Sequence, residues 1–104
     1  MSDVEVQGNG SSVSVSQADR ILLELPENPT TGYLWRVVEL PDSLEVVSDD
    51  FEPPATLAPG AGGRHRFVFA ARRSGRGTAS LKLQRPWETG DGAADEFRFD
   101  VVVA

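Results

Sequence analysis

The sequence predicts an all-β fold, an antiparallel sandwich of seven to eight short strands. Apolar side chains alternate with polar ones along most of the chain, and this period of two places them on one face of a pleated strand. Turn signals rich in Gly, Pro, Asn and Asp separate the alternating runs at short intervals. No window of helical length shows a 3.6-residue apolar stripe. Many short strands in 104 residues are typical of a sandwich or barrel.

In the N-terminal half, each expected strand is built around a set of alternating apolar residues. Val13 and Val15 are separated by serine, and Ile21, Leu23 and Leu25 share one face of the next run. Turn residues divide these runs, because they favour the backbone angles of tight connections. The expected strands here are residues 3–7, 12–16, 20–25, 33–39 and 44–50.

In the C-terminal half the alternation extends over longer runs. Three sets of apolar residues spaced by two are Phe67 and Phe69; Ala79, Leu81 and Leu83; and Phe97, Phe99, Val101 and Val103. They predict strands at residues 63–72, 76–85 and 95–103. Two hairpins are expected from the short connections, one joining 63–72 to 76–85 and the other joining 76–85 to 95–103.

Trp35 lies inside an expected strand, shortly after a turn, where an immunoglobulin-like sandwich places a core aromatic residue. The chain is long enough for one such domain and too short for two, so residues 1–104 are expected to form a single domain. No internal repeat or linker is visible. No second apolar face is evident either, and we expect a monomer.

The charge balance argues against nucleic acid and membrane surfaces as partners. The net charge is −6, which opposes binding to polyanions. The charge is uneven, because residues 1–62 hold eleven acidic and two basic residues, whereas 63–104 hold five acidic and eight basic ones. The arginines at positions 64, 66, 72, 73 and 76 form either a basic patch for phosphate or, as we favour, the solvated face of a hairpin.

Two features bear on the compartment, which the sequence leaves open. No apolar run approaches the roughly 20 residues that span a bilayer. The first residues are acidic and do not resemble a signal peptide. The protein is therefore expected in the cytoplasm, or as a secreted or periplasmic domain whose leader has been removed. The absence of Cys excludes disulfides, thiolate metal sites and thiol catalysis.

The residues give no support to an enzyme, a metal site or a cofactor. His65 is the only histidine, and no Gly-x-Ser-x-Gly motif accompanies it. Because it stands between two arginines, we expect His65 to be an exposed strand residue. The acidic pairs Asp49-Asp50 and Asp95-Glu96 are adjacent on strands, so the two members of each pair point to opposite faces and share no substrate.

The connection between the third and fourth expected strands is unusually stiff. It reads Asn28-Pro29-Thr30-Thr31-Gly32-Tyr33 and is called the first loop below. Pro29 fixes its own φ and biases Asn28 toward extended geometry, while two β-branched threonines restrict the next positions. Gly32 permits a positive φ that returns the chain to a strand. Such a loop costs little entropy to immobilise at an interface, although the segment taken alone is more readily explained as a stiff inter-strand turn.

Two further segments stand out. The second loop, Gly60-Ala61-Gly62-Gly63, is not a phosphate-binding loop, because a strand and not a helix follows it. Its small residues either allow another backbone to approach closely or form an ordinary mobile connection. The third loop, Arg85-Pro86-Trp87, begins where Pro86 ends the strand ladder. Trp87 then falls outside any alternating pattern and is either an exposed interface anchor or a lid on the sandwich end.

Taken together and in this order, the three loops resemble the signature loops of the chagasin-like inhibitors of papain-family cysteine proteases. Trp35 matches the tryptophan that follows the first loop in that family. The resemblance covers about residues 20–103. Each motif is weak alone, but all three on an all-β chain of this length are specific.

The resemblance implies an immunoglobulin-like sandwich with the three loops gathered at one end as a wedge. The partner it implies is a papain-like cysteine protease, with Thr30 and Thr31 of the first loop entering the active-site cleft. The second loop lies along the substrate groove, and Trp87 packs on an aromatic surface of the enzyme. Inhibition is then reversible occlusion. Arg64 departs from the smaller or hydroxylated residue expected after the second loop, which leaves selectivity among proteases open.

Two other functions remain open on the sequence. The chain is alternatively an immunoglobulin-like binding or adhesion module that recognises carbohydrate or protein through Trp87. A third reading is an inert structural domain that keeps these loops for folding alone.

Overall fold

The computed structural model describes residues 2–28, 31–54, 62–87 and 93–104. These residues form eight strands and no α-helix, which confirms the all-β expectation. None of the described residues belongs to a helix long and apolar enough to cross a membrane. The strands are β1 (Asp3–Glu5), β2 (Ser12–Val15), β3 (Arg20–Glu27), β4 (Leu34–Glu39), β5 (Leu44–Glu52), β6 (Gly63–Ala71), β7 (Gly75–Gln84) and β8 (Asp95–Val103).

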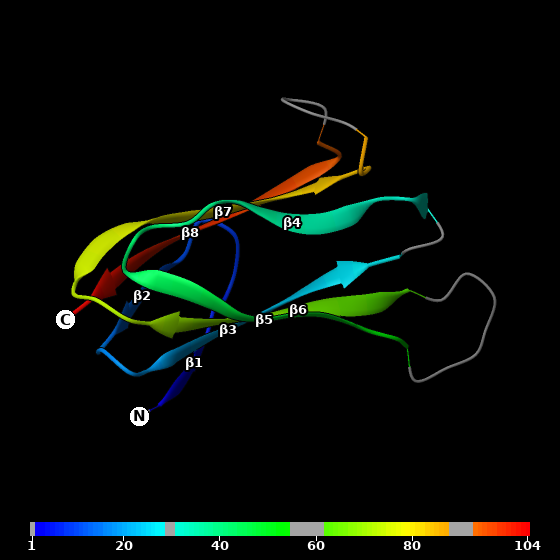
Figure 1. Cartoon of the computed structure of the whole chain (residues 1–104). Helices are drawn as coiled ribbons and strands as arrows, with labels where there is room; N and C mark the ends of the chain where they lie inside the picture. Colours follow the sequence, from blue (N-terminus) through cyan, green and yellow to red (C-terminus); the bar gives the residue numbers. More distant parts are fainter. Residues whose placement is uncertain (1, 29–30, 55–61, 88–92) are drawn as a thin grey trace.

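The strands form two packed sheets (Figure 1). The first sheet has the order β1-β3-β6-β5 and the second has the order β2-β8-β7-β4. The sheets are mixed and not purely antiparallel, because β1 pairs in parallel with β3 and β2 pairs in parallel with β8. The N-terminal segment thus adds an edge strand first to one sheet and then to the other.

The expected hairpin between residues 63–72 and 76–85 is wrong. β6 pairs with β3 and β5, whereas β7 pairs with β4 and β8, so the connection crosses from one sheet to the other. The backbone N–H of Arg72 bonds the carbonyl oxygen of Ser43 at 2.8 Å, which ties this crossover to the β4–β5 connection. The expected pairing of 76–85 with 95–103 is confirmed, in a register that sets Leu81 opposite Phe97.

The core lies between the inward faces of the two sheets. Its largest fully buried side chains come from both layers, and the rings of Phe69 and Phe99 meet across the interface with centroids 5.7 Å apart. Trp35 is buried as expected, with 4% of its surface exposed. Its indole Nε1 donates to the carbonyl oxygen of Pro26 at 2.9 Å and so links β4 of the second sheet to β3 of the first.

Three connections leave the sandwich at the same end: β3–β4, β5–β6 and β7–β8 (Figure 1). The β4–β5 and β6–β7 connections and the C-terminus lie at the other end. The strand order therefore brings together the ends of β3, β5 and β7 and the beginnings of β4, β6 and β8.

The register of β8 can be tested with two neighbouring valines. Val101 is 1% exposed and Val102 is 39% exposed, so their side chains point to opposite faces. Val101→Ala should lower the free energy of unfolding by about 2 kcal/mol, because two buried methyl groups are lost and a cavity remains. Val102→Ala should change it by less than about 0.5 kcal/mol. Urea denaturation of both variants checks this, and equal losses would contradict the inward assignment of Val101.

Candidate functional site

The described part of the first loop is closed by its own hydrogen bonds. The backbone N–H and the Oγ1 hydroxyl of Thr31 both donate to the carbonyl oxygen of Asn28, at 3.1 and 2.8 Å. Thr31 Oγ1 also accepts from the N–H of Tyr33 at 3.3 Å. Gly32 has a φ of +82°, in the left-handed region where glycine is favoured. Pro29 and Thr30 lie outside the described residues.

The base of the first loop is fastened by a buried carboxylate. Glu27 ends β3, and its side chain is only 1% exposed. Its Oε1 accepts the backbone N–H of Trp35 at 2.6 Å, on the far side of the loop. Together with the bond from the Trp35 indole to Pro26, this contact fixes both ends of the loop relative to each other. Glu27 continues the inward face of Ile21, Leu23 and Leu25, which places it below the loop and not on the surface.

His65 is largely buried beside Glu27, and the expectation that it is exposed is wrong. Its side chain is 12% exposed and its ring stacks on Phe67 at a centroid distance of 4.4 Å. The ring Nδ1 lies 3.0 Å from Glu27 Oε1, and Nε2 bonds Asp49. The cause is strand parity, because residue 65 shares its face with Phe67 and Phe69. Burial favours the neutral ring, but hydrogen bonds to Asp49 and Glu27 outweigh it and hold the pKa of His65 above its ordinary value.

The two arginines beside His65 point the other way. Arg64 and Arg66 both pair with Glu24 on the outer face of the first sheet, and Arg66 also pairs with Glu52. Arg72 pairs with Glu45. The side chains at 64, 66 and 72 therefore form a solvated, ion-paired surface, as favoured above, although β6 pairs with β3 and β5 and not with residues 76–85. Hydrogen bonds to Arg64 and Arg66 keep the pKa of Glu24 below its ordinary value.

The acidic pair Asp49-Asp50 diverges as expected for neighbours on a strand. Asp49 bonds His65, whereas Asp50 accepts from the Ser48 hydroxyl at 2.7 Å. Among the described residues no group of three or more His, Cys, Asp or Glu side chains is arranged to hold a metal ion.

The described end of the second loop packs against the first. A Cβ atom at Gly62 would lie 3.3 Å from the carbonyl oxygen of Glu27, so only a very small residue fits without movement. At Gly63 a Cβ would collide with the carbonyl oxygen of Glu52 and come within 2.7 Å of the Phe51 ring. Gly60 and Ala61 lie outside the described residues. An open groove of about 490 Å³ runs between the two loops, and its lining includes Pro26, Asn28, Thr31, Tyr33, Gly62, Gly63 and Leu83.

The third loop is joined to the first by stacked cation–π contacts. The guanidinium carbon of Arg85 lies 4.6 Å from the Tyr33 ring centroid and 5.8 Å from that of Trp87. Trp87 is 72% exposed, which agrees with an interface anchor and excludes a lid folded onto the sandwich. Pro86 is exposed beside it. The described residues of all three loops thus lie at one end of the sandwich, and sequence reasoning missed only the buried pair beneath them, Glu27 and His65.

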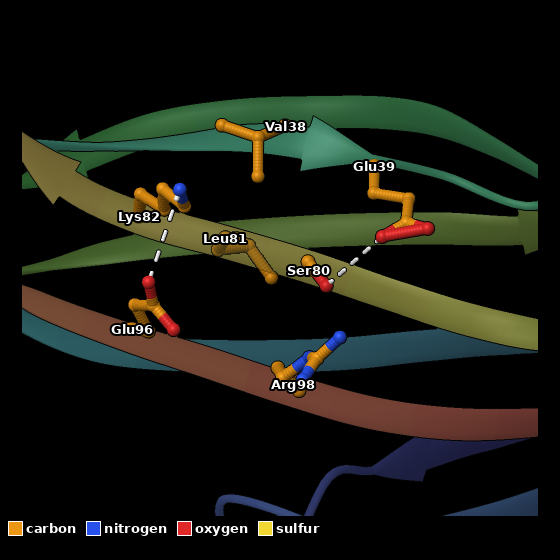
Figure 2. Close-up of a pocket in the computed structure, with 7 residues that line it drawn as sticks. All are labelled: Val38, Glu39, Ser80, Leu81, Lys82, Glu96 and Arg98. Atoms are coloured by element: carbon orange, nitrogen blue, oxygen red, sulfur yellow. Dashed lines mark hydrogen bonds and ion pairs between the residues drawn. The ribbon is translucent and has the colours of Figure 1, made fainter. Parts of the chain in front are cut away.

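Another hollow, of about 380 Å³, opens on the outer face of the second sheet (Figure 2). Lys82 Nζ lies 3.8 Å from Glu96 Oε1 across it, and Ser80 faces Glu39 (Figure 2). The lining charges are of both signs, with Lys82 and Arg98 beside Glu39 and Glu96. We assign this hollow no ligand.

Comparisons with known proteins agree with the loop pattern and the fold. The model of the chagasin family of peptidase inhibitors matches residues 14–101. Chagasin of Trypanosoma cruzi is 34% identical over 98 residues, which cover 89% of this chain and 87% of chagasin. A crystal structure of a cysteine protease inhibitor from Entamoeba histolytica superposes with a TM-score of 0.82 at 24% identity, covering 98% of this chain and 94% of that one.

A further structure, PbICP-C in complex with falcipain-2, superposes with a TM-score of 0.64 at 17% identity over the whole of both chains. At that identity the likeness concerns the fold alone. The family match spans β2 to β8 and includes all three loops. The chain therefore belongs to the chagasin family of peptidase inhibitors and is a peptidase inhibitor, not an enzyme.

Proposed function

We propose that this inhibitor occludes the active-site cleft of papain-like cysteine proteases with its first, second and third loops. The observation that carries the proposal is the convergence of the three loops at one end of a rigid sandwich. Arg85 joins the first loop to the third, and Gly62 joins the second to the base of the first. In keeping with this, PbICP-C, which shares the fold, is known in complex with falcipain-2.

The first loop is suited to enter a narrow cleft. Thr31 holds it closed through hydrogen bonds to Asn28 and Tyr33, and Gly32 supplies the positive φ of the turn. Little conformational freedom is therefore lost on binding. Its base is fastened through Glu27 and Trp35. A loop held in this way resists adopting the extended geometry of a substrate, and it blocks the nucleophile without a covalent step.

The second and third loops flank the first. The small residues of the second loop leave its main chain accessible for backbone hydrogen bonds along a substrate groove. Trp87 offers a large exposed ring whose orientation is set by Arg85. Together the three loops suit an interface on the order of 1,600 Å², the usual size for protease–inhibitor complexes.

Carbohydrate recognition through Trp87 fits these residues less well. Sugar platforms present several aromatic rings on one face, whereas Tyr33, the other described aromatic ring of the three loops, is covered by the Arg85 guanidinium. An inert domain is inconsistent with membership of an inhibitor family.

Trp87→Ala should weaken inhibition of papain by roughly 30- to 1,000-fold, since a central tryptophan anchor is worth about 2–4 kcal/mol. The assay is a titration into papain that follows hydrolysis of a fluorogenic substrate, repeated with a cathepsin-like enzyme. The melting temperature should stay nearly constant because the ring makes no core contact. Val102→Ala, an exposed apolar residue far from the loops, is the control. Unchanged inhibition by Trp87→Ala would contradict the role of the third loop.

Gly63→Ala should weaken inhibition at least tenfold and also lower the melting temperature. The added Cβ meets the Glu52 carbonyl and the Phe51 ring, so the backbone at the end of the second loop has to shift. Gly8→Ala is the matched control, because a Cβ there meets nothing within 4 Å. The measurements are the inhibition constant and a thermal melt of each variant. A Gly63→Ala variant that inhibits like the wild type would show that the position of this backbone does not matter for binding.

A further inference from the structure

Glu27, His65 and Asp49 form one hydrogen-bonded cluster beneath the first and second loops. They come from β3, β6 and β5, and all three face the same side of the first sheet. Through Glu27 the cluster also reaches the backbone N–H of Trp35 in β4 of the second sheet. The cluster therefore joins four strands at the point where the loops begin.

The geometry specifies the protonation of His65. Its Nδ1 lies 3.0 and 3.1 Å from the two oxygens of Glu27, and its Nε2 faces Asp49. A neutral imidazole has one N–H and one lone pair, so one nitrogen would oppose a carboxylate oxygen without a proton between them. With both carboxylates ionised, both contacts are satisfied by the imidazolium, which carries an N–H on each nitrogen.

Apolar groups pack around the buried part of the cluster, Glu27 and His65, whereas the Asp49 side chain is half exposed. Leu25 and Phe51 lie opposite His65 in the strand register, and Phe67 stacks on its ring. The charged groups of β3, β5 and β6 that face it are Glu27 and Asp49, because Arg64 and Arg66 point to the outer face. On the second sheet, the inward residues Trp35, Leu83 and Phe97 near this end carry no charge. Asp95, the first residue of β8, lies opposite Leu83 in the strand register and is exposed.

We propose that His65, as the imidazolium, is a positioning residue for protease inhibition, because it holds the Glu27 carboxylate that fixes the first loop against the second. The proposal rests on the proposed function. Glu27 Oε1 closes the first loop by accepting from Trp35 and also faces His65, so one oxygen serves both contacts. His65 follows the second loop by two residues, and the Glu27 carbonyl is the group that Gly62 approaches.

The consequence is an inhibition constant that depends on pH. The folded-state pKa of His65 is raised, so its contribution is fully present below its ordinary value of about 6.5 and is lost as pH rises through the folded-state value. Above that value a buried carboxylate faces a ring that offers one N–H fewer, and burying a carboxylate without its full set of donors is unfavourable. The loop bases then loosen and inhibition weakens.

The first test compares the inhibition constant of the wild type with that of His65→Gln against papain at a series of pH values. The ratio of the two constants at each pH removes the ionisation of the protease itself. We expect His65→Gln to be about tenfold weaker at pH 6, with the difference vanishing at high pH. A ratio that stays at one throughout overturns the proposal, whereas failure of the wild type to inhibit at any pH overturns the proposed function instead.

The second test compares the titration of His65 with the pH dependence of inhibition, and it uses Asp49→Asn to remove one negative charge beside the ring. His65 is the only histidine, so its ring protons report one titration by NMR. The wild-type inhibition constant should rise through the same pH midpoint as this titration. Asp49→Asn should move both midpoints to lower pH, because one of the carboxylates that favour the imidazolium is neutralised.

Asp50→Asn is the matched control, since Asp50 is adjacent and exposed but bonds Ser48 and not His65. It should leave both midpoints where they are. Titration of His65 with no accompanying change in the inhibition constant would overturn the proposal, because a merely structural histidine gives that result.

Discussion

The arrangement of the loop end depends on a single buried carboxylate. Glu27 stands where β3 ends, accepts the backbone N–H of Trp35 from the opposite sheet and faces the His65 ring. A carboxylate enclosed to this degree is tolerated only when donors surround it. The strands that supply those donors, β4 and β6, are the ones that border the first and second loops. The requirement to satisfy one charge thus sets the relative positions of two loops.

The sandwich supplies the rest of the geometry. Because β6 and β7 belong to different sheets, the chain changes layer at the end away from the loops, where Arg72 bonds Ser43. That crossover returns β7 toward the same end as β3 and β5, so the three loops are neighbours although they are distant in sequence. Core packing between Phe69 and Phe99 then holds the two layers together.

Alternation along the chain was enough to predict seven to eight strands and the burial of Trp35, since each follows from which residues can face a core. For Trp87 it left both exposure and a lid on the sandwich end open, and the structure shows the exposed position. Alternation did not predict the partners of each strand. Periodicity assigns strand faces and not strand neighbours. The short turn after β6 therefore predicted a hairpin, although β6 and β7 belong to different sheets. The burial of His65 was not predicted because two arginines flank it, and no role was predicted for Glu27. The sequence did contain a signal for their burial: His65 lies on the same strand face as Phe67, and Glu27 lies on the same strand face as Ile21.

The stacking of Arg85 between Tyr33 and Trp87 has a consequence for how selectivity can change in this family. Arg85 of the third loop contacts the ring of Tyr33, the last residue of the first loop, so a change in one loop also alters the other. Transplanting the first loop from a relative with a different residue at position 33 would also reorient the tryptophan, and its effects would not add to those of a change in the third loop. The wedge is therefore not modular: new protease preferences require coordinated replacement of both segments.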